Sequence, residues 1–197
     1  MDNKTETTAA ALKPVRSIYE FVEMVVLAIV ITMTIFMFIG RLTTVDGQSM
    51  NNTLAHGEVL LVTNIGKAPE RGDIVVFQSP GSHLKAPIVK RIIATEGETV
   101  DIDFDNWIVY VNGEPLYADE NGNPLREPYV NYENSRMHQY DRDFPYTVPE
   151  GHVFVMGDNR NHSNDSRGTD IGTIDRRYIF GKVIFRIKPL GRMGTVA

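Results

Sequence analysis

The feature that most constrains this chain is an uncharged run from Met24 to Gly40, built mainly of valine, leucine, isoleucine, methionine and phenylalanine. As a helix, its seventeen residues rise roughly 25 Å, near the lower limit for crossing the hydrocarbon core of a bilayer. Ile18 to Val22 extend the run, although Glu20 and Glu23 lie at its start. Because a helix that is apolar on all sides favours a membrane over the core of a small protein, we predict a transmembrane anchor over residues 18–40.

The flanks of this run argue for an uncleaved anchor and give its orientation. Phe38-Ile39-Gly40-Arg41-Leu42 offers no small-x-small site for cleavage as a signal peptide. Lys4, Lys13 and Arg16 precede the run, and only Arg41 follows it closely. The positive-inside rule then predicts a cytoplasmic tail over residues 1–17 and an extracytoplasmic region over residues 41–197 in a single-pass protein of the cell membrane. The first sixteen residues are polar and rich in threonine and alanine, and we expect them to be disordered.

Beyond the anchor, the pattern changes to that of a mainly β domain. Short apolar runs bounded by glycine and proline are typical of strands in a packed sheet. They cover Val59–Val62, Ile74–Phe77, Ile88–Ala94, Thr99–Val111, His152–Met156 and Tyr178–Ile187. Asn112-Gly113 is a strong hairpin signal. Residues from about 100 to 150 include many polar, tyrosine and proline residues, which predicts a smaller and less regular inserted subdomain of strands and loops.

Composition excludes several classes of function. The chain has no cysteine, so thiol nucleophiles, disulfide frameworks and thiolate metal sites are excluded. The net charge of -5 comes without a basic patch, which argues against a nucleic-acid partner. We expect neither a metal site nor a cofactor.

The stretch Val45–Leu54 follows the anchor closely and contains a candidate nucleophile, Ser49. A serine in a turn rich in glycine and asparagine is often only a turn residue. To act as a nucleophile it needs a base, and histidine is the usual one. The five histidines are His56, His83, His138, His152 and His162, of which His162 is the best placed.

Lys90 is a stronger candidate base for a physical reason. Residues two apart on a strand share a face, so Lys90 would lie between Ile88 and Ile92. Burial among apolar side chains disfavours the ammonium form and lowers the pKa of the amine. The alternative is that Lys90 extends to solvent from the edge of the sheet.

Three stretches, Val45–Leu54, Pro87–Ile93 and Gly157–Arg167, occur in this order behind the anchor and resemble bacterial type I signal peptidase. This family consists of membrane-bound serine proteases that remove signal peptides from exported proteins. The resemblance runs from about Ile18 to near the C-terminus and is greatest to the Gram-positive form with a single anchor. It implies a compact β-rich domain in which Ser49 is the nucleophile and Lys90 the general base. It also implies three partners, namely the signal peptides of exported preproteins, membrane lipid and the secretion machinery.

The resemblance further implies two groups of supporting residues. The Ser163 hydroxyl would bind and orient the lysine ammonium, and structural ion pairs would be formed by Asp158, Asp165, Arg167 and Arg91. The substrate would lie extended beside the nucleophile, with small side chains one and three residues before the cut. Shallow apolar pockets would select these by excluding larger groups. The residues at matching positions are Val45, Met50, Leu54, Ile88 and Val89.

The sequence departs from the family pattern at three positions. Asn52 replaces a usual proline, and Ala94 replaces a common glycine. Gly47 replaces a serine that helps to bind the oxyanion in the Gram-negative form, which leaves one oxyanion donor unassigned. Because that relative has serine here within the same flanking motif, we expect Gly47→Ser to keep or gain cleavage rate. The alternative is that Gly47 is needed for a positive φ angle, in which case the variant should lose most activity and some stability.

Two other functions compete with this prediction. A self-cleaving Ser-Lys protease of the repressor type would need a DNA-binding or effector segment in place of the anchor. A membrane-tethered β domain that only binds a partner would have a similar pattern of strands but no catalysis.

Overall fold

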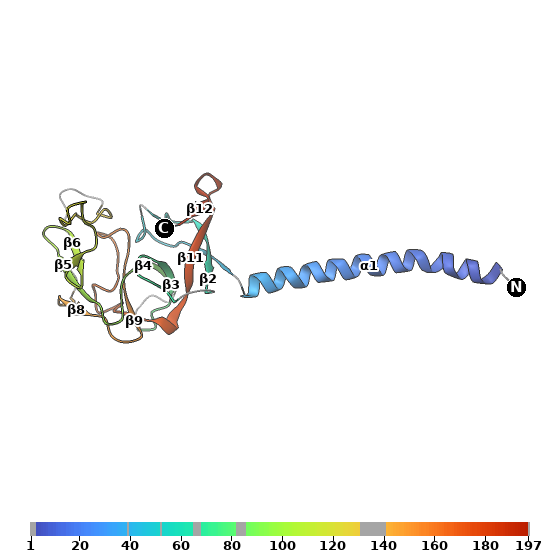
Figure 1. The fold of residues 1–197 in the computed structure, drawn as a ribbon, viewed down its shortest axis with the longest axis horizontal. Helices are drawn as coiled ribbons and strands as arrows, with labels where there is room; N and C mark the ends of the chain where they lie inside the picture. Colours follow the sequence, from blue (N-terminus) through green and yellow to red (C-terminus); the bar gives the residue numbers. More distant parts are fainter. Residues whose placement is uncertain are drawn as a thin grey trace. The chain divides into compact units, whose positions relative to one another are not determined.

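The computed structural model describes residues 3–38, 40–51, 53–64, 68–81, 86–130 and 141–196, and the side chains of these residues outside 3–16 and 35–38. The chain separates into two compact units, Met1–Gly40 and Arg41–Ala197. The first unit is helical and the second is built of strands, so the fold is mainly β with one N-terminal helix, as the sequence predicts (Figure 1).

Helix α1 (Asn3–Phe38) makes up the first unit. Its segment Ser17–Thr34 has a mean hydropathy of 1.8 and is long and apolar enough to cross a membrane. Large apolar side chains along this segment are exposed, from Ile18 to Met33. The helix begins at Asn3, so the expected disorder of residues 1–16 is wrong from that residue on. Ala9-Ala10-Ala11-Leu12 are strong helix formers, and a helix that has already formed extends easily into such a segment.

The larger sheet of the second unit is antiparallel throughout. Its strands are, in spatial order, β1 (Arg41–Thr44), β2 (Val59–Thr63), β11 (Ile179–Lys188), β3 (Ile74–Phe77), β4 (Ile88–Thr95), β9 (His152–Met156) and β10 (Ile174–Asp175). Strand β12 (Gly194–Thr195) also pairs with β11. Two short 3-10 helices, η1 (Arg176–Tyr178) and η2 (Leu190–Arg192), flank β11. The apolar runs of the sequence form the central strands because each can be buried between neighbours.

A smaller antiparallel sheet lies within the region predicted to be an inserted subdomain, and we keep that name for this sheet and its loops. Its order is β7 (Glu114–Pro115), β6 (Ile108–Val111), β5 (Thr99–Asp103) and β8 (Tyr146–Thr147). The predicted strand Thr99–Val111 is in fact two strands joined by a turn that ends at Trp107, whose φ is 63°. The Asn112-Gly113 hairpin is confirmed, because φ is 57° and 83° at these residues, as a two-residue turn between twisted strands requires.

The two sheets share one hydrophobic core. Ile93 and Ala94 of β4, with Phe154 and Met156 of β9, pack against apolar residues of the smaller sheet. Those residues are Val100, Ile102, Trp107, Val109 and Val111. In Figure 1, β5, β6 and β8 gather at one end of this unit, beyond β4 and β9. The inserted subdomain is therefore packed against the strand that carries Lys90.

Candidate active site

The loop that carries Ser49 is anchored by apolar side chains on either side of it. Val45, Met50 and Leu54 are buried in one core cluster with residues of β2, β3 and β11. The backbone N–H of Leu54 donates to the Met50 carbonyl at 2.8 Å, which closes a tight turn after the serine. Ser49 is therefore half-buried at the surface of this packed apolar cluster.

Strand β4 brings Lys90 to this serine. Lys90 pairs with Val75 of β3, and its Nζ lies 2.5 Å from Ser49 Oγ in a hydrogen bond. The side chain lies between the buried Ile88 and Ile92 and is only 3% exposed. Burial lowers the pKa of Lys90 to about 8, helped by Arg167 and opposed by the carboxylates of Asp165 and Asp158. An amine with this pKa is partly neutral near pH 7, as a general base must be.

The first buried ion pair behind the dyad joins Asp165 to Arg167. Arg167 Nε lies 2.8 Å from Asp165 Oδ1, and neither side chain is exposed. Burial alone would raise the pKa of Asp165, but the Arg167 charge and hydrogen bonds from Ser163 and Gly157 hold it below its ordinary value. The carboxylate thus stays ionised near Lys90 and ties the two ends of the 157–167 loop together.

A second buried ion pair joins this loop to β4. Arg91 Nη2 lies 2.7 Å from Asp158 Oδ2, and Arg91 Nη1 donates to the Gly72 carbonyl at 2.8 Å. The Thr53 hydroxyl donates to Asp158 Oδ2 at 2.6 Å. The Asn159 N–H donates to the Ser49 carbonyl at 2.9 Å. The three stretches singled out in the sequence are therefore in direct contact.

Gly157 lies where these stretches approach most closely. A Cβ atom on this residue would overlap the Ser163 hydroxyl and the Ser49 carbonyl, so only glycine can occupy the position. Ser163 is buried, and its hydroxyl lies against Gly157, beside the loop that carries Ser49. Its role in orienting the Lys90 ammonium stays a prediction.

A cavity of about 210 Å³ opens beside the dyad and contains Ser49 and Lys90 in its wall. Four of the five predicted substrate-binding residues line it, namely Val45, Met50, Ile88 and Val89. Leu54 is not among the lining residues. It is fully buried in the core cluster with Met50, so its predicted place in a substrate pocket stays a prediction. The turn after Ser49 directs this side chain inward.

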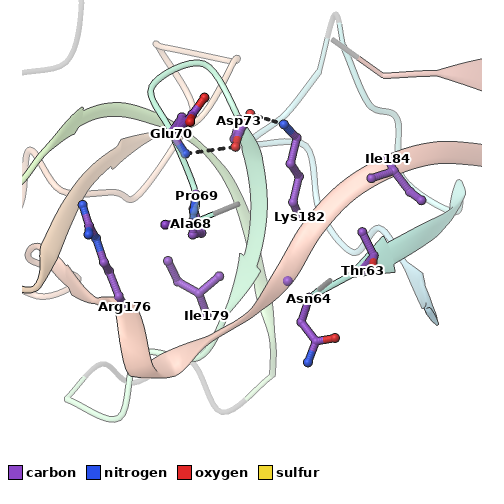
Figure 2. Close-up of a pocket in the computed structure, with 11 residues that line it drawn as sticks. Thr63, Asn64, Ala68, Pro69, Glu70, Asp73, Arg176, Ile179, Lys182 and Ile184 are labelled. Carbon is purple, nitrogen blue, oxygen red and sulfur yellow. Dashed lines mark hydrogen bonds and ion pairs between the residues drawn. The ribbon is translucent and has the colours of Figure 1, made fainter. Parts of the chain in front are cut away.

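A larger cavity of about 430 Å³ lies elsewhere, between the ends of β2 and β11 and the segment before β3 (Figure 2). Figure 2 shows Lys182 of β11 pointing toward Asp73, with which it forms an ion pair of 2.5 Å. Neither Ser49 nor Lys90 is among its lining residues. Ser49 and Lys90 therefore line the smaller of these two cavities, so cavity size does not indicate where the dyad lies.

Gly47 has a conformational reason to be glycine. Its φ is +97°, a backbone conformation that L-residues rarely adopt, although a Cβ atom there would meet nothing within 4 Å. Its N–H donates to His56 Nδ1 at 3.2 Å. This φ value favours the alternative in which Gly47 sets the backbone, because strain rather than space then opposes serine. The effect of Gly47→Ser on cleavage stays a prediction.

None of the three histidines that the structure describes is the partner of Ser49 Oγ. His162 is exposed, and the group bonded to Ser49 Oγ is the Lys90 amine. His56 contacts the Gly47 N–H, and His152 contacts the Glu150 carbonyl. His83 and His138, like Asn52, lie outside the described residues.

Sequence reasoning missed several residues of the site. Thr53 and Asn159 lie within the quoted stretches, but nothing in their local pattern predicts their partners. Arg160 is fully buried. It lies in Gly157–Arg167, the most distinctive of the three stretches, so its place in that stretch could have marked it as a site residue. Its partner Glu127 lies in the inserted subdomain, which only tertiary structure brings near.

Comparison with known proteins gives a consistent result. Residues 18–188 match the family model described as signal peptidase, peptidase S26. The probable signal peptidase I-1 of Synechocystis sp. is 34% identical over 192 residues, covering 93% of this chain and 89% of the relative. Signal peptidase I of Bacillus licheniformis is 33% identical over 186 residues, covering 90% and 92%. A solved signal peptidase I from Enterococcus faecalis is 32% identical, with a TM-score of 0.43 over 59% of this chain and 97% of its own.

Proposed function

The chain belongs to the signal peptidase family, peptidase S26, and from this we propose a membrane-bound serine endopeptidase that cleaves N-terminal signal peptides with a dyad of Ser49 and Lys90. Family membership makes the chain a serine peptidase and supports signal peptides as its substrates. The single observation that carries the dyad is the hydrogen bond between Lys90 Nζ and Ser49 Oγ inside a buried apolar environment.

The proposed reaction is acyl transfer in two steps. Neutral Lys90 accepts the proton of Ser49 as Oγ attacks the carbonyl carbon of the scissile bond. The Lys90 ammonium then gives that proton to the leaving amine, and an acyl-enzyme remains on Ser49. Lys90 next removes a proton from water, which attacks the ester carbonyl. The bond to Ser49 Oγ then breaks, the Lys90 ammonium returns the proton to Ser49, and the signal peptide is released. The backbone N–H of Ser49 is the proposed first donor to the oxyanion.

The substrate is proposed to bind in extended form beside β4, with small side chains in the cavity next to the dyad. Val45, Met50, Ile88 and Val89 give the wall its apolar character. The proposed preference for small side chains would come from these larger apolar residues, which narrow the wall where the substrate side chains enter.

Helix α1 is the proposed membrane anchor, with the N-terminus in the cytoplasm and residues from 41 on outside. Its exposed apolar surface supports contact with membrane lipid. The exposed site would then meet preproteins as they leave the secretion machinery.

The test is cleavage of a labelled preprotein by the full-length protein in detergent. Ser49→Ala should lose cleavage by about 10³-fold or more, because the nucleophile is removed. Ser79→Ala is the matched control, since Ser79 is a buried serine whose hydroxyl donates to the Ile171 carbonyl instead. Normal cleavage by Ser49→Ala would refute the dyad. A wild-type protein that cuts no preprotein would leave a tethered binding domain, and one that cuts only itself would indicate a self-cleaving protease.

A further inference from the structure

A fully buried ion pair connects the inserted subdomain to the active-site loop. Glu127 lies in the inserted subdomain, between β7 and β8, and Arg160 lies in the 157–167 loop. Arg160 Nη2 is 2.8 Å from Glu127 Oε2, and the two side chains are 0% and 1% exposed. Removing two ionic groups from water is unfavourable, and apolar residues of similar volume often stabilise a protein as well. Stability is therefore a weak explanation for this pair.

Arg160 is the junction between this pair and the loop. Its Nη1 donates to the Gly157 carbonyl at 2.5 Å and lies 3.6 Å from Asp158 Oδ1. Its own carbonyl accepts from Arg167 Nη1 at 2.8 Å. One guanidinium thus contacts both residues at the start of the loop and, through Nη2, the Glu127 carboxylate.

Tyr129 adds a second connection from the same subdomain. The guanidinium carbon of Arg160 lies 4.9 Å from the centre of the Tyr129 ring, and that of Arg91 lies 5.4 Å from it. The Arg160 N–H also donates to the Tyr129 carbonyl at 3.2 Å. Arg91 follows Lys90 in β4 and binds Asp158, so the ring contacts both cations that surround this carboxylate.

The loop held in this way touches the nucleophile directly. Gly157 packs against the Ser49 carbonyl, and the Asn159 N–H donates to that same carbonyl at 2.9 Å. A small shift of residues 157–160 would therefore move Ser49 relative to Lys90. It would also admit water to the buried surroundings of the Lys90 amine, which face Asp158, Asp165 and Arg167.

We propose that Glu127 is a positioning residue for the reaction of Ser49 and Lys90, acting through Arg160 to hold residues 157–160 against the nucleophile. The catalytic consequence rests on the proposed function, whereas the structural coupling does not. The inserted subdomain is then part of the catalytic apparatus rather than a separate appendage.

The first test compares two variants of the full-length protein that lose the same charge. Glu127→Gln keeps the volume of the buried side chain, and Glu114→Gln is the control at an exposed position of β7. Glu127→Gln should lower kcat about tenfold or more, since small misplacements of reacting groups are costly. KM should stay unchanged, because Glu127 is not among the residues lining the cavity. The acidic limb of the pH–rate profile should move to higher pH, since a rehydrated Lys90 holds its proton more tightly.

The second test does not depend on cleavage. The Lys90 amine is titrated by NMR in a Ser49→Ala background, with and without Glu127→Gln. We expect the pKa of Lys90 to rise in Glu127→Gln and to stay the same in Glu114→Gln. An unmoved titration together with an unmoved kcat would overturn the proposal. A wild-type protein that cuts no preprotein while the titration still shifts would refute the proposed function and leave the coupling in place.

If Glu127→Gln does not fold, Tyr129→Leu is the second variant for the same measurements. This variant removes the ring from both guanidiniums and leaves the ion pair, so the same shift of the pH–rate profile is expected in smaller measure. A merely structural role predicts a lower Tm with an unchanged acidic limb and an unchanged Lys90 titration. That result in folded Glu127→Gln, or in folded Tyr129→Leu where the first variant fails, would also overturn the proposal.

Discussion

Lys90 acquires its proposed chemistry from burial. Its pKa falls from the ordinary value of 10.5 to about 8 even though Asp165 and Asp158 oppose the change. A difference of this size corresponds to about 3 kcal/mol, which the packing of β4 has to supply. At pH 7 about one molecule in ten then carries a neutral Lys90, whereas an unperturbed lysine would be neutral in fewer than about one in a thousand.

The first prediction concerns the pH dependence of acylation. Because the base must be neutral, the rate should rise with pH through an apparent pKa near 8 and level off above it. Pre-steady-state cleavage of a preprotein, followed from about pH 6 to about pH 10, would measure this dependence. Lys90→Arg should be inactive at every pH, since guanidinium keeps its proton. An active Lys90→Arg enzyme would return His162 to consideration as the base.

The second prediction concerns Gly47, whose φ of +97° makes any L-residue strained. Gly47→Ser should lower the free energy of unfolding by about 1–2 kcal/mol and reduce turnover at least about tenfold, because the strain lies beside the nucleophile. Thermal denaturation and cleavage rate are the measurements. Gly191→Ser is the matched control, since Gly191 has an ordinary φ and an added Cβ would meet nothing within 4 Å. A stable Gly47→Ser enzyme with higher turnover would show that the position lacks only a hydroxyl.

At the scale of elements, the chain contains two ion pairs with the same local spacing but opposite burial. Asp165 and Arg167 are completely buried in the active-site loop. Asp175 and Arg177 lie where β10 meets η1, and the arginine side chain is 85% exposed. Water can replace a lost partner at the second site but not at the first, so the two pairs should respond very differently to loss of the aspartate charge.

The third prediction compares Asp165→Asn with Asp175→Asn. Asp165→Asn leaves a buried arginine without its counter-charge and should lower the free energy of unfolding by about 3–5 kcal/mol. Asp175→Asn should change it little. Chemical denaturation near pH 7 measures both. Since the folded pKa of Asp165 lies below its unfolded value, the stability it contributes is present above the unfolded value and is lost as pH falls through the folded one. Equal losses in the two variants would contradict this account.

Strands could be predicted where the apolar run was long enough. The predicted ends of β2, β3, β4 and β9 agree with the structure to within one residue. Short apolar runs bounded by turn residues are typical of buried strands, which makes these elements predictable from sequence. Strands β8, β10 and β12 have only two residues each, and β1 is polar and largely exposed. Their pairing depends on neighbours distant in sequence, so no local pattern reveals them.

At the scale of the whole molecule, the sequence predicts which residues form the site, whereas the contacts between them follow from the tertiary fold. Ser49 and Lys90 come together because the loop after β1 packs against β2, β11 and β3, the strands that lie between β1 and β4, which a linear pattern does not specify. The burial of Leu54 was likewise not specified by its position in the sequence, because it follows from the turn that presents Ser49. The Glu127–Arg160 pair was unpredictable for the same reason, since its partners lie in different parts of the fold.

The last prediction concerns the orientation of the chain in the membrane. Lys4, Lys13 and Arg16 precede the apolar segment of α1, and only Arg41 lies just after it. Retention of basic residues on the cytoplasmic side predicts that protease added to spheroplasts digests residues beyond about 41 and leaves the N-terminal tail intact. Replacing the three N-terminal basic residues with glutamine, and adding three lysines after Gly40, should reverse this protection in a measurable fraction of molecules, because the charge difference is then inverted. The matched control adds three glutamines at the same place and should keep the original pattern. A C-terminal unit that stays protected in wild-type spheroplasts and is digested only after lysis would place the site in the cytoplasm. That result would also separate it from preproteins that have already crossed the membrane.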